Sequence, residues 1–178
     1  MLHARLAKAK PQLLGLRGVE MERITISDRY LNAPLALALL ASALAGLAAG
    51  GPVHAISVTT SEPRPRAAPS WIHDNWERSD ERDAVLRALL SRLAPNVDVR
   101  SRPLGQVAHD RSIGIRWTNG AEAELTLDQG MGAWRAHDRV AHRFGDPPEE
   151  QAEALAAPAF AVRLHGERTP MILVLRQP

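Results

Sequence analysis

A histidine and an arginine stand two residues apart at His109 and Arg111, in a segment that alternates polar and apolar residues up to Trp117. Residues two apart on an extended segment project to the same side. An imidazole beside a guanidinium suits phosphate or carboxylate oxygens, because both groups donate hydrogen bonds and the guanidinium is a fixed fork. The pair therefore predicts an oxyanion or phosphate contact. On spacing alone, the simpler interpretation is a loop histidine and a solvated arginine.

Other patterns that carry chemistry are absent from the sequence. There is no cysteine, which excludes disulfides, thiolate nucleophiles and Cys-based zinc sites. No Walker loop, dinucleotide-binding fingerprint or G-x-S-x-G elbow occurs. His137 and His142 are five residues apart, a spacing that does not direct both rings at one ion from a helix face. We therefore expect neither a metal ion nor a cofactor.

The elements that must position these residues begin with a strand, a helix and a second strand. Residues 23–27 alternate with β-branched side chains, as a strand does. Asn32 as N-cap and Pro34 near the first helical position predict a helix over 33–49. Residues 53–60 are strand-like again. Strand, helix and strand in this order predict a parallel βαβ unit.

The predicted helix lies in a run of 17 uncharged residues, 35–51. Crossing a bilayer takes about 17–25 apolar residues, so a membrane span is an alternative at the short limit. The run is rich in alanine and glycine, and the flanking strands fit a βαβ unit. We expect a buried helix that covers a sheet, and no transmembrane segment.

A second helix is predicted over 79–93, because Ser79 opens a capping sequence and the apolar residues that follow recur at helical spacing. The apolar face of this helix consists of Val85, Leu86, Leu89, Leu90 and Leu93. The other faces carry Arg82, Arg87 and Arg92. Trp71 and Trp76, just before this helix, are candidates for a lid or anchor, and packing in the core is the simpler expectation.

The second half of the chain is predicted to be rich in strands. The predicted strands cover residues 96–102, 112–117, 121–127, 160–164 and 171–175, with a short helix at 148–157. Asn119 and Gly120 form a strong hairpin turn between the second and third of these strands. The order of elements predicts an α/β fold with a mixed sheet.

The basic residues are unevenly distributed. Arginine supplies 20 of the 22 basic residues, a bias that GC-rich codons also produce. Residues 87–116 hold six arginines and two acidic residues, whereas residues 117–178 hold six basic and nine acidic residues. A basic stretch beside an acidic one suggests an anionic partner on one face, although most such runs are solvated surface.

The segment ITISDRYL at 24–31, followed by an apolar helix, resembles the opening of the phospholipase D-like domain found at the C-terminus of MIT (microtubule-interacting and transport) proteins. In that family a His-x-Arg-x-Ile strand follows, then a hairpin through Asn-Gly and a strand that ends in a glycine-containing loop. Similar residues here are 109–113, Asn119 and Gly120, and 128–134.

This resemblance covers roughly residues 23–176 and implies a phospholipase D-like mixed sheet flanked by helices. Residues 1–22 are then a lead-in, either a short helix or a poorly ordered terminus, and 23–178 form the domain. Relatives of this kind also occur in bacteria, including beside DEAD/DEAH-type helicases in defence loci. The low lysine content of the chain fits a bacterial source.

The catalytic motif of the phospholipase D superfamily is His-x-Lys followed by four residues and Asp, normally present twice. On this chain His109 keeps the nucleophile position, Arg111 replaces the lysine, and Arg116 falls where the aspartate is needed. A histidine nucleophile needs a carboxylate to hold its tautomer and share its charge. We therefore assign no catalytic residue, and His109 would act only in a site completed by a dimer partner.

The resemblance places His109 and Arg111 near the edge where Arg29 follows the first strand. Ligands of open α/β sheets collect at such edges, outside the carboxyl ends of strands. The expected phosphate-binding residues are Arg29, His109, Arg111 and Gln129, supported by Asp28, Tyr30 and Asp128. The alternative is that Asp28 or Asp128 pairs with Arg111, in which case the cluster is an ion-pair network that only holds the fold.

The favoured function is a non-catalytic module that binds phosphate, chiefly on nucleic acid, as a cytoplasmic subunit of a larger assembly. A bacterial antiviral defence complex with a helicase is one such assembly. The first alternative is a metal-independent nuclease or phosphodiesterase that uses His109, and the second is attachment to anionic lipid. A homodimer is compatible with each. The aromatic content of 4% argues against a platform that stacks several bases.

Overall fold

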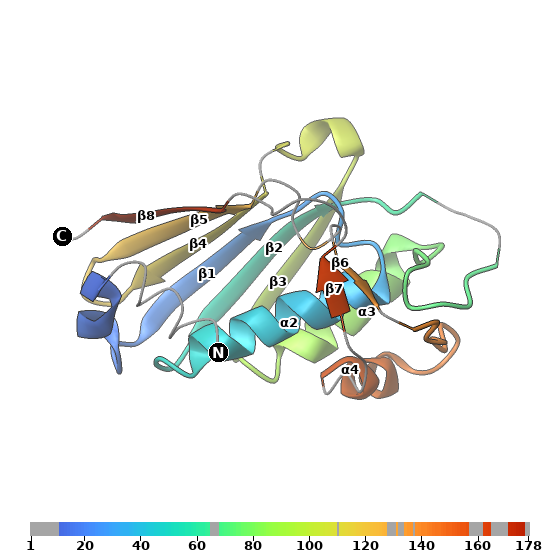
Figure 1. Ribbon diagram of the computed structural model, residues 1–178, viewed down its shortest axis with the longest axis horizontal. Coiled ribbons are helices and arrows are strands. Elements are labelled where there is room, and N and C mark those ends of the chain that lie inside the picture. Colours follow the sequence, from blue (N-terminus) through green and yellow to red (C-terminus); the bar gives the residue numbers. More distant parts are fainter. Residues whose placement is uncertain are drawn as a thin grey trace.

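The computed structural model describes residues 11–64, 68–109, 111–127, 131, 134–136, 138–156, 162–164 and 171–176. Their elements, in chain order, are η1 (Pro11–Leu16), β1 (Met21–Ser27), α2 (Pro34–Ala48), β2 (Ala55–Ser61), α3 (Ser79–Leu90), β3 (Asn96–Arg102), η2 (Leu104–Gln106), β4 (Arg111–Trp117), β5 (Glu122–Leu127), β6 (Trp134–Ala136), α4 (Pro148–Ala156), β7 (Val162–Leu164) and β8 (Met171–Arg176). Six strands form one sheet in the order β3-β2-β1-β4-β5-β8, and β6 pairs with β7 apart from it (Figure 1).

Half of the large sheet is parallel, because helices connect its strands. α2 returns the chain from β1 to β2, and α3 returns it from β2 to β3. The register places Ile24 beside Ile56 and Ile56 beside Val97, so apolar residues fall on one face across three strands. The predicted βαβ unit is therefore confirmed.

The other half is antiparallel. β4 runs against β1, with Ile24 opposite Ile115, and β5 returns beside β4. Their connection is the predicted hairpin turn, in which Gly120 has φ +87°, a backbone conformation that glycine adopts without a steric cost. β8 adds to the far side of β5, while β7 pairs with β6, so the last two strands belong to different sheets.

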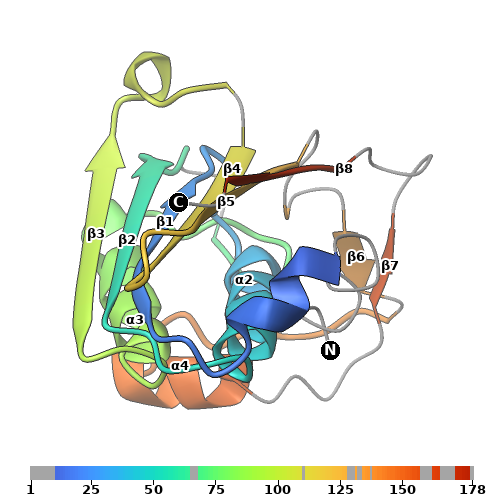
Figure 2. The same cartoon turned by 90° about the vertical axis from the view of Figure 1, so that its left-hand side faces the viewer.

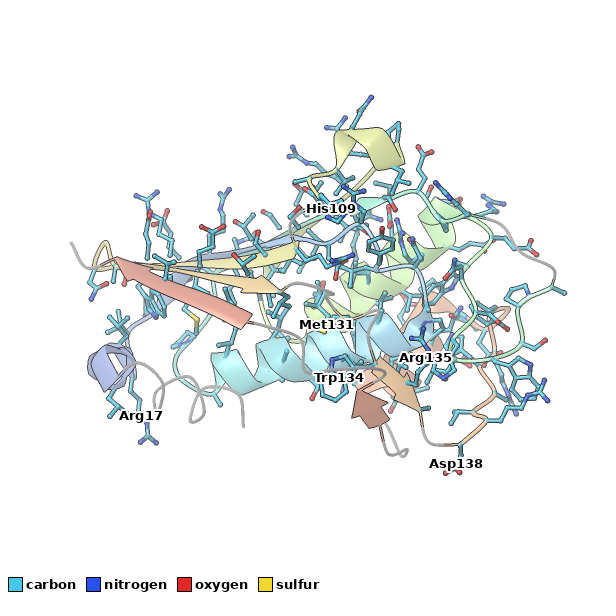
Figure 3. All side chains as sticks on the ribbon, turned by 45° about the horizontal axis from the view of Figure 1, so that its top comes forward. Arg17, His109, Met131, Trp134, Arg135 and Asp138 are labelled. Atoms are coloured by element: carbon cyan, nitrogen blue, oxygen red, sulfur yellow. The ribbon has the colours of Figure 1, made fainter. Side chains whose placement is uncertain are left out.

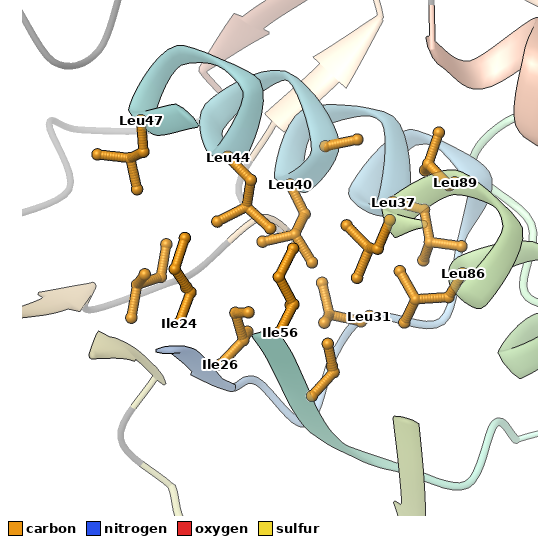
Figure 4. Close-up of a cluster of buried hydrophobic side chains, with 14 of the residues drawn as sticks. Ile24, Ile26, Leu31, Leu37, Leu40, Leu44, Leu47, Ile56, Leu86 and Leu89 are labelled. Atoms are coloured by element: carbon orange, nitrogen blue, oxygen red, sulfur yellow. The ribbon is translucent and has the colours of Figure 1, made fainter. Parts of the chain in front are cut away.

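α2 forms the centre of the core (Figure 4). Its leucines at 37, 40 and 44 are almost fully buried and face Ile24, Ile26 and Ile56 of the sheet. Burying one such side chain contributes about 1.5–3 kcal/mol. The apolar residues of α2 thus pack against the sheet, as predicted. Among the described residues no helix is long and apolar enough to span a bilayer.

Figure 2 shows α2, α3 and α4 on the same side of the curved sheet. The prediction of a mixed α/β sheet flanked by helices is confirmed, with these helices on one face. The opposite face carries polar and small residues from alternating positions, including Thr25, Gly114 and Glu124. A sheet with one covered face and one polar face has the alternation that antiparallel sheets commonly show.

Two predicted helix starts are wrong in detail. The residue that precedes α2 is Ala33 rather than Asn32, and it makes no capping hydrogen bond with its side chain. Arg78, not Ser79, precedes α3, and α3 ends at Leu90. Arg82 was expected on a solvent-facing side of this helix but is fully buried. At α2 the Asn32 side chain bonds to Arg82 and Ser61 instead of capping the helix. At α3 the Arg78 side chain pairs with Asp80 and Glu81 of the first turn.

The tryptophan prediction is confirmed for Trp76, which has no exposed surface and meets the rings of His142 and Phe144 edge to face, with centroids 5.7 and 5.4 Å away. Trp71 is half-buried, and the guanidinium of Arg139 lies 3.8 Å from its ring centre.

Within the described residues the fold begins before residue 23, the boundary expected from the sequence. Met21 is already in β1, and Leu16 is buried in the core. The division into a lead-in and a domain stays a prediction.

At the other side of the sheet β3 is an edge strand. Asp98, Arg100 and Arg102 are exposed along it. Arg87 of α3 donates from Nη2 to the Val99 carbonyl of this strand at 3.2 Å.

Candidate functional site

Five of the predicted site residues lie at the edge where β1, β2 and β3 end: Asp28, Arg29, Tyr30, His109 and Arg111. Because β4 runs antiparallel to β1, its first residue, Arg111, lies at this same edge, and Ser27 is paired with Ser112. Asp28, Arg29 and Tyr30 follow directly after β1. The edge therefore collects side chains from two strands of opposite direction, as ligand sites of open α/β sheets do.

Arg29 connects this edge to the loop before His109. Its Nε donates to the Ala108 carbonyl at 3.4 Å and its Nη2 to the Val107 carbonyl at 3.2 Å. A guanidinium has five N–H donors, so Arg29 uses only part of its capacity on these two carbonyls. Its position also fixes the loop segment that carries His109.

Arg111 pairs with Asp28, with 3.8 Å between Nε and Oδ1 and side chains only 11% and 6% exposed. Asp28 also accepts hydrogen bonds from the backbone N–H of Tyr30 at 2.8 Å and of Met131 at 3.4 Å. Burial raises the pKa of Asp28, while these donors and Arg111 oppose the rise. Asp28 and Arg111 thus form the ion pair that the alternative interpretation of the sequence predicts. This pair offsets part of the Arg111 charge inside the protein.

Tyr30 is one of the few large side chains left open, with 42% of its surface exposed. The guanidinium carbon of Arg111 lies 4.6 Å from its ring centre and that of Arg29 lies 6.0 Å away. Both distances are within the range of cation–π attraction. Two cationic groups therefore gather around one exposed ring.

His109 is exposed in the loop above this edge (Figure 3). It makes no hydrogen bond or ion pair with the other described residues, and it follows directly after Ala108, which accepts from Arg29. The sequence prediction that Arg29, His109 and Arg111 share an edge agrees with this placement. Asp128 and Gln129, predicted to close the site, lie outside the described residues.

The position that the phospholipase D motif reserves for aspartate lies elsewhere. Along β4 the odd-numbered residues 111, 113, 115 and 117 are buried, whereas Arg116 is exposed on the other face of the sheet. Arg116 pairs with Glu22 at 3.2 Å and with Glu122 at 3.9 Å. Position 116 is therefore turned away from Arg111, whichever residue type occupies it.

Beneath the edge lies a buried network that sequence reasoning missed. Arg82 of α3 pairs with Asp83, with 2.9 Å from Nε to Oδ1, and donates to the Ser61 carbonyl at 2.8 Å. It also bonds to the Leu31 carbonyl, the Asn32 side chain and Ser101, whose hydroxyl donates to Asp83 at 2.6 Å. Burial lowers the pKa of Arg82 and the Asp83 carboxylate acts against this.

This network joins the ends of three strands and so holds the floor of the site. Ser61 ends β2, Ser101 lies near the end of β3, and Leu31 follows β1. A signal for it exists in the sequence, because residue 82 precedes Val85 by three and Leu86 by four. That spacing places Arg82 on the apolar face of the helix.

Within the described part of the chain, no three His, Asp or Glu side chains gather as metal ligands would. The edge offers guanidinium, imidazole and phenol groups, which suit an anion rather than a cation.

The family model for the DEAD/DEAH box helicase YjiV, C-terminal domain, matches residues 2–177. No curated protein matches the chain. The association with a DEAD/DEAH-type helicase that the sequence led us to expect is thus supported at the level of the family. The chain belongs to the family of the C-terminal domain of the DEAD/DEAH box helicase YjiV.

Proposed function

We propose that this chain is a non-catalytic module that binds phosphate groups of a nucleic acid at the carboxyl edge of its sheet, within an assembly that contains a helicase. The observation that carries the proposal is the convergence of Arg29, exposed Tyr30 and His109 at one edge. The family supports it, because a helicase works on nucleic acid.

The residues at this edge have different roles, which follow from their surroundings. Arg29 supplies charge and its remaining donors to a phosphate oxygen, and His109 adds a hydrogen bond. The Tyr30 ring packs against a sugar or base. Arg111, whose charge Asp28 partly offsets, positions the Tyr30 ring. Gln129 as a further phosphate contact and Asp128 as its support remain part of the proposal.

Absence of catalysis belongs to the same proposal. A phospholipase D-like relationship would give His109 the nucleophile position, but position 116 faces the other side of the sheet. We expect no turnover of DNA, RNA or bis-p-nitrophenyl phosphate. Bacterial origin, a role in antiviral defence, a cytoplasmic location and a homodimer are likewise proposals.

The test is binding of fluorescein-labelled single- and double-stranded DNA and RNA, measured by anisotropy at several salt concentrations. Arg29→Gln is expected to weaken binding to all sequences alike and to reduce the salt slope by about 1, because one phosphate contact is lost. His109→Ala is expected to weaken binding without changing Tm, since His109 is exposed. Arg92→Gln, an exposed arginine after α3, is the matched control.

Two results would count against the proposal. If wild-type protein binds none of these nucleic acids but binds vesicles containing phosphatidylserine, the edge serves a lipid surface. If it hydrolyses phosphodiesters and His109→Ala abolishes turnover while a chelator does not, the nuclease alternative is correct.

A further inference from the structure

Tyr30 presents an open aromatic ring at the carboxyl edge. It is 42% exposed, and it is the aromatic one among the three large hydrophobic side chains exposed in the described part of the chain. The guanidinium carbon of Arg111, whose side chain is only 11% exposed, lies 4.6 Å from the ring centre. Because Arg111 is buried, the ring face that contacts it is turned toward the protein. The exposed surface of Tyr30 therefore lies on the other side of the ring.

The position of this ring is fixed from the protein side. The backbone N–H of Tyr30 donates to Asp28 Oδ1 at 2.8 Å, and Asp28 in turn pairs with Arg111. Cation–π attraction to Arg111 favours one placement of the ring, and a tyrosine has only two side-chain torsions to fix. The ring is thus ordered before a ligand arrives, which reduces the entropy lost on binding.

Arg29 is held in a defined position beside the ring. Its guanidinium carbon lies 6.0 Å from the Tyr30 ring centre. Its backbone carbonyl accepts hydrogen bonds from Ser61 Oγ and Asn32 Nδ2. Asn32 and Ser61 are both bonded to the buried Arg82. The edge therefore offers a cationic group and an open ring at a short, fixed separation, which matches the phosphate and the base of one nucleotide.

Whether a base can stack on such a ring depends on whether the base is paired. Within a duplex, neighbouring base pairs cover both faces of each base, so a protein reaches only the base edges and the backbone. In a single strand the faces are free and stack on aromatic side chains. Duplex grooves are read by an α-helix or a two-stranded ribbon. The described segments next to Tyr30 and His109 are instead loops and the three-residue helix η2.

We propose that the ligand of this edge is single-stranded nucleic acid, with one unpaired base stacked on the open side of Tyr30 and the adjoining phosphate on Arg29. The inference rests on the proposed function and decides between the sugar and the base as the partner of the ring. One ring holds one base, in keeping with the aromatic content of 4%. Because every base has a π face, strands of any sequence fit this chemistry.

The experiment compares single strands with a duplex by fluorescence anisotropy on the whole chain. The probes are labelled oligothymidylate and oligouridylate of about 12 nucleotides, within the site sizes of single-strand-binding domains, and a DNA duplex of equal length. We expect the tighter-binding single strand to bind about fivefold or more tightly than the duplex, because only the single strand gains the stacked base. The order of the two single strands shows whether DNA or RNA is preferred.

Two variants of Tyr30 test the stacked base. Tyr30→Leu still covers Arg111 but has no aromatic face, so it should weaken single-strand binding about fivefold or more and lower the preference over the duplex. Its salt slope should equal that of the wild type, because no phosphate contact is lost. Tyr30→Phe keeps the ring and should restore the preference. Leu14→Ala, which removes an exposed apolar side chain from η1, is the matched control.

A strand that carries 2-aminopurine reports stacking directly, because its fluorescence is quenched when the base stacks. We expect quenching by the wild type and by Tyr30→Phe but not by Tyr30→Leu. A duplex bound as tightly as the single strands overturns the inference, as does Tyr30→Leu that binds and quenches like the wild type. If Arg29→Gln still weakens binding in that case, the proposed function stands with the sugar as the partner of the ring. If no probe binds, the proposed function and this inference are both wrong.

Discussion

At the level of single residues, the arginines of this chain divide by what surrounds their guanidinium groups. Arg82 is fully enclosed and bonds to Asp83 and to the ends of three strands. Arg111 is 11% exposed and paired with Asp28. Arg29 is half-buried and bonds to two loop carbonyls. Arg82 therefore stabilises the fold and Arg111 orders the edge of the sheet. Arg29 is the arginine best able to contact a ligand.

Replacing Arg82 should be among the most damaging single changes. Arg82→Met leaves Asp83 as a buried carboxylate without its partner, and breaking such a pair costs about 3–5 kcal/mol of unfolding free energy. Urea denaturation followed by circular dichroism measures this. Arg92→Met, on the surface, should stay within about 0.5 kcal/mol. A loss for Arg82→Met as small as for this control would show that the network adds nothing.

Variants of Arg111 and Arg29 distinguish a structural role from a binding role at this edge of the sheet. Arg111→Ala should lower the free energy of unfolding by about 3–5 kcal/mol, because it leaves the buried carboxylate of Asp28 uncompensated. Arg29→Gln should cost little stability and yet weaken nucleic-acid binding. Measuring Tm and anisotropy on both variants checks this division. If Arg29→Gln lowers Tm as much as Arg111→Ala and leaves binding intact, the whole cluster is structural.

At the level of elements, α2 shows how a helix without a single charge becomes a core element. Its leucines at 37, 40, 44 and 47 recur at helical spacing and meet the sheet, and its other positions are mostly alanine. Alanine has the highest helix propensity and leaves room for the neighbouring β6 and α4. The helix is held by what it packs against, since neither end has a side-chain cap described for it.

A truncation in α2 should therefore be costly. Leu44→Ala removes a side chain with no exposed surface, and large-to-small changes of this kind cost about 2–5 kcal/mol. Thermal or urea unfolding gives the value. Ser42→Ala, on the exposed side of the same helix, is expected to be neutral or slightly stabilising because alanine is the better helix former. Equal losses in both variants would contradict the assignment of the buried face.

Periodicity predicted most elements because each buries one side: the βαβ unit, the 119–120 hairpin and the helices at 79–90 and 148–156 all occur. The features that periodicity missed depend on contacts between residues far apart in the sequence. Asn32 bonds to Arg82 instead of capping α2, and the three-residue strand β6 exists only through its pairing with β7. The site residues were placed at one edge by resemblance, but the burial of Arg111 and the exposure of Tyr30 follow from packing that no local pattern contains.

At the level of the whole molecule, two histidines tie stability to pH, half-buried His142 and the more exposed His73. Burial lowers the pKa of His142, which bonds through Nε2 to Gln151 Oε1 at 2.9 Å, and of His73, which accepts from the Ala136 N–H at 3.3 Å. Below about pH 6.5 the unfolded chain takes up protons that the folded chain resists. The free energy of unfolding should then fall as the pH drops from 6.5 through the lowered pKa values.

Urea unfolding at pH 7.5 and at pH 5 measures that fall. His142→Asn should reduce the difference between the two conditions, although it lowers stability at both through lost packing with Trp76 and Phe144. His54→Asn, at an exposed histidine just before β2, serves as the comparison. A difference that His142→Asn leaves unchanged would place the acid sensitivity in other groups.

The charged edge strand β3 has a consequence for how the protein behaves at high concentration. An unpaired strand edge is a template on which further chains can add and grow into fibrils. Here Asp98, Arg100 and Arg102 stand exposed along that strand, and the Arg87 side chain rests on its backbone. An incoming strand would have to strip water from these charges and displace that guanidinium. The β3 edge is therefore a poor seed for amyloid growth, and fibrils should not start from it even at high concentration.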